Sequence, residues 1–428
     1  MKNLKELFLK EVLQNIKSRE AREFVEKELN YHLQRSRSEW ISKGLSEEAA
    51  DEQAVQHMGN PSELGQQLNK LHRPKVDWML LGLLIVALGM GFLPLLSVQH
   101  EYGFSIVANQ AFYILVGVAT ALSMMYLDYR NLEKWSWHFL SIGILFQLAL
   151  FSIPNITING MPYIHVLGFS FSAITALPFL FLFWASLFAK RKAKLWLMIL
   201  IYFTTTFLFI RLYALPVAMI YSILVLFLFW GSSFKRKTIY LTTLIVACTG
   251  LILISFIWSR TWAYQINRLL GFLNPEGDPN GLGYMYIKIK EMISGGGWFG
   301  NEKIAQFVPE MSTDFAFANI TYFYGWLVAG FLVLMLTLIA VRMVFITGHI
   351  KDPFGKQLVT GTIALFTIQF LYNIGMSLGL LPIVTISLPF ISYGLTPTVL
   401  NSFLIGIVLS VYRRKDLLLV EGNRKIIK

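Results

Sequence analysis

Long apolar runs alternate with short polar breaks along most of this chain. From Trp78 onward each run is roughly 18 to 25 residues long, enough to cross about 30 Å of hydrocarbon as an α-helix. The runs lie near 77–97, 107–126, 136–153, 168–188, 195–211, 213–231, 239–258, 319–341, 357–378 and 390–412. The pattern predicts an all-α polytopic membrane protein with about ten transmembrane helices.

The segment from residue 1 to about 74 follows a different pattern, in which apolar positions recur at helical spacing among dense charges. These positions, whose spacing is typical of one buried helix face, are Leu7, Val12, Ile16, Phe24, Val25, Leu29 and Leu33. Ser46 and Asn60 are capping residues that precede helix-compatible stretches, and Pro61 follows Asn60. We therefore predict a small soluble bundle of three or four short helices that ends near Pro74.

Basic side chains gather in every second break between the apolar runs. They are Arg130, Lys134, Lys190, Arg191, Lys192, Lys194, Lys235, Arg236, Lys237, Arg342, Lys351, Lys356, Arg413, Arg414 and Lys415. The opposite breaks at 98–106, 154–167 and 379–389 contain no Lys or Arg. Because basic loops stay on the cytoplasmic side, we expect a multi-pass protein of the bacterial cytoplasmic membrane with both termini in the cytosol.

The composition is that of a membrane protein, because only 14% of the residues are charged and 55% are hydrophobic. In soluble proteins about a quarter of the residues are charged. The net charge of +12 lies in the short breaks, so a nucleic-acid-binding surface is not expected. The single cysteine, Cys248, excludes a disulfide within the chain and makes cysteine metal or redox chemistry implausible. The charged, amphipathic first residues lack the features of a secretory signal.

One break on the predicted outer side is much longer than the others. Residues 259–318 form a segment of about 60 residues that is rich in Gly, Pro and ionisable side chains, too long for a simple connector. Its landmarks are the stretches 267–275 (NRLLGFLNP), 281–284 (GLGY), 294–300 (SGGGWFG) and 307–315 (FVPEMSTDF). A second block contains Gln369, 373–376 (NIGM), Gly379, 381–382 (LP) and 388–394 (LPFISYG).

These landmarks, in this order, resemble the SEDS family (shape, elongation, division and sporulation), the RodA, FtsW and SpoVE type peptidoglycan glycosyltransferases of bacterial cell-wall synthesis. The likeness is clear over about 262–415 and extends more weakly back to about 77. Residues 1–74 resemble the permease prefix domains of some bacterial membrane proteins, although an ordinary amphipathic bundle is an equal alternative. We therefore expect a cytosolic prefix domain at 1–74, a SEDS-like membrane domain at 75–415 and a cytosolic tail at 416–428.

The resemblance implies a reaction at the outer face, in which lipid II, a disaccharide-pentapeptide on undecaprenyl pyrophosphate, is polymerised into glycan strands. A sugar hydroxyl attacks the anomeric carbon of a second molecule, so a general base is needed beside the hydroxyl and positive charge beside the leaving pyrophosphate. Asp314 stands at the position of the family's essential aspartate and is the implied base; a helix cap is the alternative. Glu310 would share its face if the helix extended that far, and an exposed loop glutamate is equally open.

The candidates for holding the pyrophosphate are the cations of the loop, because lysine and arginine pair well with phosphate oxygens. They are Lys290, which aligns with a lysine common in the family and ranks first, and Lys288, Arg268 and Lys303. The resemblance extends substrate binding to Gln369, Asn373 and Ser392 of the second block. Glycines 295–297 lack the Gly-Lys-Ser/Thr of a phosphate loop and predict a tight, mobile turn.

The expected partners follow from the resemblance. They are lipid II, membrane lipids, a class B penicillin-binding transpeptidase and a cytosolic regulator of the prefix domain. A divalent cation near Asp314 and Glu310 stays open because the substrate carries a pyrophosphate, but no metal-ligand spacing requires one.

The first half of the chain departs from the family's pattern. Family members carry Gly-x-x-Arg-Trp before the fourth span, where residues 160–164 read GMPYI, and Gln-Pro-Ser-Glu at its start, where 169–175 read FSFSAIT. The acidic Pro-Asp-Leu-Gly after the fifth span is replaced by 213–217 (YALPV), and the usual histidine and second glycine are Ser312 and Leu395. Charges inside membranes are usually kept for a function, so two alternatives remain: a non-catalytic scaffold or regulator of wall synthesis, and a flippase or transporter.

Overall fold

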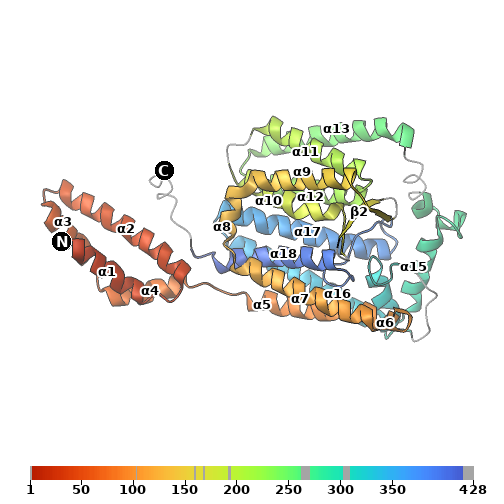
Figure 1. Ribbon diagram of the computed structural model, residues 1–428, viewed down its shortest axis with the longest axis horizontal. Coiled ribbons are helices and arrows are strands. Elements are labelled where there is room, and N and C mark those ends of the chain that lie inside the picture. Colours follow the sequence, from red (N-terminus) through yellow and green to blue (C-terminus); the bar gives the residue numbers. More distant parts are fainter. Residues whose placement is uncertain are drawn as a thin grey trace. The chain divides into compact units, whose positions relative to one another are not determined.

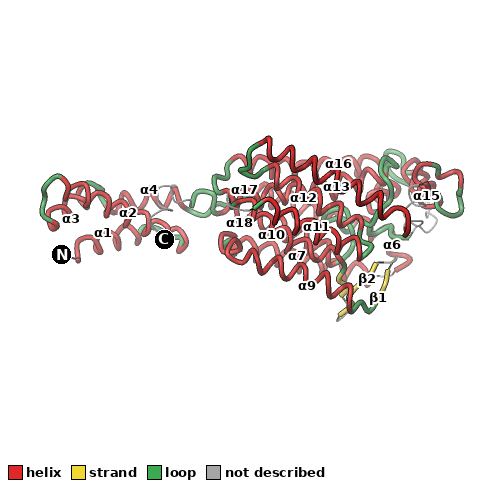
Figure 2. The backbone as a smooth tube through the Cα atoms, turned by 90° about the horizontal axis from the view of Figure 1, so that it is seen from above, coloured by secondary structure: helices red, strands yellow, loops and turns green. Residues whose placement is uncertain are grey.

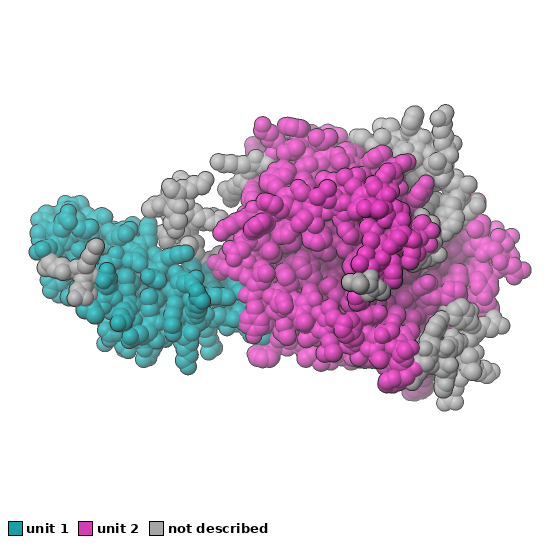
Figure 3. Space-filling model, viewed as in Figure 1, with its two compact units in different colours: residues 1–77, 412–428 teal, residues 78–411 magenta. Residues whose placement is uncertain are grey.

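A computed structural model describes residues 2–102, 104–158, 161–166, 169–190, 194–261, 270–301 and 309–417. The chain divides into two compact units, residues 1–77 with 412–428, and residues 78–411 (Figure 3). The helices before Asp77 are α1 (Lys2–Gln14), α2 (Arg19–Ser42), α3 (Glu47–Gln56) and α4 (Pro61–His72) (Figure 1).

The second unit is built mainly from long helices with one small sheet. In chain order its elements are α5 (Trp78–Met90), α6 (Leu93–Tyr102), α7 (Ser105–Tyr126), α8 (Tyr129–Leu132), α9 (Ser136–Ser152), β1 (Ile156–Ile158), β2 (Met161–Val166), β3 (Phe169–Phe171), α10 (Leu177–Ala189), α11 (Leu195–Arg211), α12 (Leu215–Trp230), α13 (Arg236–Thr261), α15 (Tyr284–Gly295), α16 (Ala316–Gly348), α17 (Pro353–Ser377) and α18 (Leu395–Arg413).

Helices α3 and α4 of the first unit begin where their capping residues predict. Ser46 accepts a hydrogen bond from the main-chain N–H of Ala49 at the start of α3, and Asn60 accepts from those of Ser62 and Glu63 at the start of α4. Pro61 occupies the first turn of α4, where its missing N–H costs nothing. The predicted bundle of short helices is confirmed for this segment.

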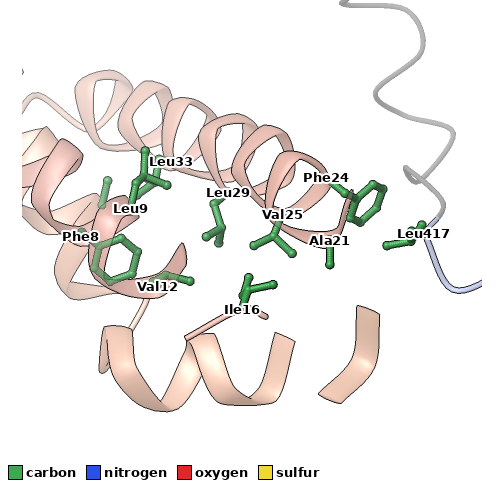
Figure 4. Close-up of a cluster of buried hydrophobic side chains, with 11 residues drawn as sticks. Phe8, Leu9, Val12, Ile16, Ala21, Phe24, Val25, Leu29, Leu33 and Leu417 are labelled. Carbon is green, nitrogen blue, oxygen red and sulfur yellow. The ribbon is translucent and has the colours of Figure 1, made fainter. Parts of the chain in front are cut away.

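The core of the first unit contains most of the predicted apolar face (Figure 4). Val12, Ile16 and Val25 are fully buried, but the side chain of Leu7 is 57% exposed. The prediction for Leu7 is wrong because α1 buries Phe8 and Leu9 in the core instead.

The last described residues of the chain belong to this same unit. Leu417 lies in its hydrophobic core, and the buried guanidinium of Arg414 is 2.8 Å from Glu20 Oε1. Lys75 Nζ is 2.8 Å from Asp416 Oδ2, and the main-chain N–H of Lys75 donates to the carbonyl of Arg413. The unit is therefore assembled from segments at both ends of the sequence.

The described part of the second unit contains six helices that are long and apolar enough to span a membrane: Trp78–Ser97, Ser105–Tyr126, Tyr129–Ser152, Ala316–Gly348, Pro353–Ser377 and Leu395–Arg413. Three shorter apolar helices cover Ala173–Ala189, Leu195–Arg211 and Leu215–Trp230. Helix α13 coincides with the seventh predicted span. The predicted all-α polytopic membrane fold is confirmed.

Four predicted spans differ locally from the helices. The fourth, predicted over 168–188, begins with β3, and its helix α10 starts only at Leu177. The first is divided between α5 and α6 at Gly91, where a Cβ would lie 2.5 Å from the carbonyl oxygen of Phe390, so only glycine permits this approach. Helix α16 is broken at Gly325, whose φ is +81°. The last span begins only at Leu395, since residues 390–394 form a non-helical segment with a φ of +65° at Phe390.

A small antiparallel sheet with the order β1-β2-β3 follows α9. The sequence predicts a connector at the first two strands and the start of the fourth span at β3. Tyr163 of β2 pairs with Ile156 of β1, and His165 pairs with Ser170 of β3. Figures 1 and 2 both place this sheet, α6 and α15 at the same end of the helices of the second unit. That end carries the candidate site.

Candidate active site

A tight turn before α16 carries Asp314 and Glu310. The carbonyl of Glu310 accepts hydrogen bonds from the main-chain N–H groups of Thr313 at 3.1 Å and Phe315 at 3.0 Å, and the φ of Glu310 is +62°. The helix that would place Glu310 and Asp314 on one face does not extend to this turn. Phe315, not Asp314, occupies the N-cap position of α16. The half-buried Asp314 lies in the turn, one residue before the N-cap.

Asn373 and Ser392 hold this turn from two other parts of the chain. Asn373 Nδ2 donates to the carbonyl of Asp314 at 2.8 Å and to that of Ile386 at 2.7 Å. Ser392 Oγ donates to the carbonyl of Thr313 and accepts from the main-chain N–H of Leu388 at 2.7 Å. Because both side chains are buried and bind main-chain groups, we assign them to positioning the Asp314 turn.

Gln369 lies deeper among the helices. Its Nε2 donates to the carbonyl of Leu365 on its own helix at 3.0 Å, and its Oε1 accepts a 3.4 Å hydrogen bond from Asn401 of α18. Only 2% of Gln369 is exposed. These contacts join α17 to α18, whereas Asn373, one turn further along α17, reaches the Asp314 turn.

Helix α15 covers the turn with its apolar face. Ile289 and Met292 are buried in one cluster with Met311 and Phe315, so α15 and the Asp314 turn share a core. The hydroxyl of Tyr286 accepts a 3.0 Å hydrogen bond from the main-chain N–H of Ile383. This packing fixes the helix that carries the candidate cations.

The candidate cations differ in their surroundings. Lys288 Nζ donates to Glu291 Oε2 at 2.8 Å, and this hydrogen bond raises the pKa of Lys288. Lys290 is exposed on the same helix. Arg268 and Lys303 lie outside the residues that the structure describes. Lys288 therefore remains charged but is already paired, while Lys290 is open to solvent.

The glycine-rich turn after α15 packs against the break in α16. A Cβ on Gly296 would lie 2.1 Å from a main-chain oxygen of α16, and one on Gly300, whose φ is +96°, would be equally close to another. The N–H of Trp326, just after Gly325, donates to the carbonyl of Gly297 at 3.0 Å. The turn is tight, as predicted, and it packs against α16 through these contacts.

Tyr163 reaches the two carboxylates from the sheet. Burial raises the pKa of its phenol, and the negative charges of Asp314 and Glu310 raise it further. The neighbouring strand is attached to the same region, because Thr396 Oγ1 donates to the carbonyl of Ser170 at 3.5 Å. The sequence analysis does not include Tyr163 among the site residues.

A sequence signal for this sheet does exist. Asn159-Gly160 stands between two stretches of alternating character, 156–158 (ITI) and 161–166 (MPYIHV), and Asn-Gly in such a setting is a strong hairpin signal. Counting from Gly160, Tyr163 also stands at the position of the arginine in the family's Gly-x-x-Arg-Trp stretch.

Among the described residues, no three His, Cys, Asp or Glu side chains come close enough together to hold a metal ion. Asp314 and Glu310 therefore supply a pair of carboxylates beside a phenol, and a divalent cation there would need oxygen ligands from the substrate. The arrangement suits acceptance of a proton from a hydroxyl group by a carboxylate.

Comparison with known proteins shows the family of the chain. A sequence model of the FtsW, RodA and SpoVE cell cycle proteins matches residues 75–417. The chain belongs to the FtsW/RodA/SpoVE family. This family is the SEDS family that the loop landmarks resemble.

Relatives within the family have several names. A probable peptidoglycan glycosyltransferase FtsW of Trichlorobacter lovleyi is 26% identical over 323 residues, which cover 71% of this chain and 82% of the relative. The peptidoglycan glycosyltransferase MrdB of Escherichia coli is 32% identical over 161 residues, 36% of this chain and 44% of the relative. The stage V sporulation protein E of Bacillus subtilis is 32% identical over 155 residues, 35% and 42% of the two chains.

Solved structures share the fold of this SEDS protein. A chain from a peptidoglycan synthase complex that coordinates polymerization and crosslinking superposes with a TM-score of 0.69 at 22% identity, covering 79% of this chain and 98% of its own. The rod shape determining protein RodA of Thermus thermophilus gives a TM-score of 0.58 at 18% identity, covering 81% and 98%. At such identities the likeness shows the common fold.

Proposed function

We propose that this SEDS protein is a peptidoglycan glycosyltransferase that polymerises lipid II at the outer face of the bacterial cytoplasmic membrane. The observation that carries the proposal is the half-buried Asp314 in a turn whose main chain is held by Asn373 and Ser392. Relatives named peptidoglycan glycosyltransferases support the same activity.

The reaction requires one bond to form and one to break. The hydroxyl oxygen of the acceptor sugar attacks the anomeric carbon of the donor, and its proton passes to the carboxylate of Asp314. The bond from the anomeric carbon to the pyrophosphate oxygen breaks, and the electron pair leaves with the lipid pyrophosphate. Glu310 lies in the same turn, where its carboxylate accepts a hydrogen bond from the Thr313 hydroxyl.

Positive charge near the leaving group is the second requirement. Lys290 on α15 is exposed, whereas Lys288 is paired with Glu291. We therefore keep Lys290 as the first candidate of α15 for the pyrophosphate, with Lys288 available if Glu291 is displaced. Arg268 remains a candidate from the sequence.

The surroundings of the enzyme follow from the same proposal. The basic breaks support a topology with both termini in the cytosol and the Asp314 turn outside. A class B penicillin-binding transpeptidase is the expected partner, which agrees with the fold shared with a chain of a peptidoglycan synthase complex. Residues 1–74 act as a prefix domain that binds a cytosolic regulator.

The experiment compares purified wild-type protein with Asp314→Asn on lipid II, using gel separation of the glycan strands. Asp314→Asn keeps the size of the side chain but removes the base, so we expect polymerisation to fall about 10²- to 10⁴-fold. Asp278→Asn is the matched control, because Asp278 lies in the same long loop and its Oδ2 only accepts a local hydrogen bond from Leu282 at 3.0 Å.

Other outcomes separate the alternatives. Equal strand synthesis by wild type and Asp314→Asn would contradict the role of Asp314. A wild-type protein that makes no strands but stimulates a partner's synthesis would be a scaffold. Movement of labelled lipid across vesicles without polymerisation would identify a flippase.

A further inference from the structure

The small sheet brings two chemically active side chains to one of its faces. Side chains two residues apart in a strand point to the same side, so Tyr163 and His165 of β2 share a face. The phenol of Tyr163 is within electrostatic reach of Asp314 and Glu310. His165 lies on the same face about 6–7 Å further along the strand.

His165 is held more firmly than an ordinary loop histidine. The side chain of Asn155 donates to the His165 carbonyl and accepts from the His165 N–H, both at 2.7 Å. The ring Nδ1 is 2.9 Å from Ser170 Oγ on β3, the residue that faces His165 across the strand pair. Main chain and ring are thus both fixed, and Nε2 is left to point away from Ser170.

The sheet is fixed to the elements that also hold the Asp314 turn. Thr396, at the start of α18, donates to the carbonyl of Ser170 at 3.5 Å. Three residues earlier, the N–H of Tyr393 donates to the carbonyl of Ser312 at 2.8 Å. One short stretch, 393–396, therefore contacts both β3 and the turn, and this brings the sheet close to the Asp314 turn.

The electrostatics of the site explain why such a face is needed. Two carboxylates repel an incoming pyrophosphate, so a cation or strong hydrogen-bond donor must lie on the side where the leaving group departs. Among the described cations of α15, Lys288 is already paired with Glu291, and Lys290 is exposed. A donor on the sheet would add to Lys290 from another element.

We propose that Tyr163 and His165 form a second wall of the active site, in which the Tyr163 hydroxyl hydrogen-bonds the reacting sugar and His165 Nε2 binds the pyrophosphate of the lipid substrate. This assignment rests on the proposed glycosyltransferase function. It gives the first half of the chain, which lacks the arginine and glutamate usual in the family, its own binding groups. The neutral phenol donates one hydrogen bond, while the imidazole donates from Nε2 and gains a positive charge when protonated.

The test uses Tyr163→Phe, His165→Gln and the control Ile164→Val in the full-length protein. Ile164 lies between the two residues on the opposite face and pairs with Phe171. Two quantities are measured: polymerisation of lipid II with kcat and KM separated, and binding of undecaprenyl pyrophosphate to the detergent-purified protein. Unfolding temperatures equal to that of Ile164→Val show that the sheet is intact.

We expect His165→Gln to weaken undecaprenyl pyrophosphate binding and to raise KM about tenfold, because a charge-assisted hydrogen bond is lost. Tyr163→Phe is expected to lower kcat about tenfold with pyrophosphate binding unchanged, since it loses one hydrogen bond to the reacting sugar. If the two residues had a purely structural role, the variants would show the wild-type kcat, KM and undecaprenyl pyrophosphate binding per folded molecule.

The outcomes distinguish this inference from the function on which it rests. If wild type polymerises lipid II and both variants stay within twofold of it, the second wall is wrong and the glycosyltransferase stands. If wild type makes no glycan but binds undecaprenyl pyrophosphate and His165→Gln weakens that binding, the His165 site stands and the proposed function fails. Absence of both activities in wild type overturns both.

Discussion

Replacement of Asn373 tests whether the Asp314 turn is positioned from α17. Asn373→Ala removes hydrogen bonds to the carbonyls of Asp314 and Ile386, at 2.8 and 2.7 Å, and leaves both without this donor. An unsatisfied buried carbonyl costs about 1–3 kcal/mol, so the pair amounts to about 2–6 kcal/mol of folding stability at most. Asn373 is fully buried, so water cannot readily replace the amide.

The consequence for catalysis is separate from that for stability. A shift of about 1 Å in a reacting group can cost about a hundredfold in rate. We expect Asn373→Ala to lower kcat in lipid II polymerisation about 10- to 100-fold per folded molecule, with a smaller change in KM. The assay combines glycan synthesis with thermal unfolding in detergent, so that the folded fraction is known.

Tyr221→Phe is the matched control. The hydroxyl of Tyr221 is buried among α10, α11 and α12 and makes two hydrogen bonds, to Trp184 Nε1 at 2.7 Å and Thr205 Oγ1 at 2.6 Å. It should lower the unfolding temperature without changing the rate per folded molecule. If Asn373→Ala is destabilised like Tyr221→Phe but polymerises at the wild-type rate, the positioning role is refuted.

Three further predictions concern single side chains. Gly300→Ala places a Cβ 2.1 Å from a main-chain oxygen of α16 and should lower stability by at least about 2 kcal/mol. The Cβ of Gly297→Ala meets nothing within 4 Å, so this variant should lose only about 1–2 kcal/mol, because of its positive φ. Chemical unfolding of both variants measures the difference. Arg414→Met removes a buried ion pair with Glu20 at 2.8 Å and should destabilise the first unit by about 1.5–3 kcal/mol, seen as faster proteolysis within residues 1–77; unchanged cleavage would contradict it. The pKa of the Tyr163 phenol is raised in the folded protein. Its contribution to stability is therefore complete below the ordinary pKa of about 10 and is lost as the pH rises through the raised value. Tyr163→Phe should accordingly lose less thermal stability than wild type between about pH 9 and 12; parallel losses in the two proteins would show that this phenol does not titrate in the folded state.

The helices of this protein could be predicted because their signals are local. Apolar runs and capping residues such as Ser46 and Asn60 lie within the elements that they specify, and the structure places helices there. The predicted helix boundaries were wrong where main chain from a distant part of the sequence packs against a helix. Gly91 interrupts the first span beside Phe390, almost three hundred positions later in the chain, and no local pattern contains that contact.

The site was predictable in its chemistry but not in its geometry. Asp314 follows from the loop landmarks, whereas its hydrogen-bond partner Asn373 is 59 residues away and the Ser392 contact with Thr313 spans 79. Resemblance points to Asn373 and Ser392 as substrate ligands, and only the fold shows what their side chains contact. Tyr163 was missed because its strand is short and polar enough to look like a connector.

The first unit has a consequence for the order in which the newly made chain can fold. Leu417 and Arg414 are translated after every membrane helix, yet both are buried in a bundle whose other members are the first residues made. Part of the hydrophobic core of the N-terminal helices therefore stays exposed until the segment with Arg414 and Leu417 has been synthesised. Chains that stop early would keep that surface open, and this gives cellular proteases a way to distinguish them from finished protein.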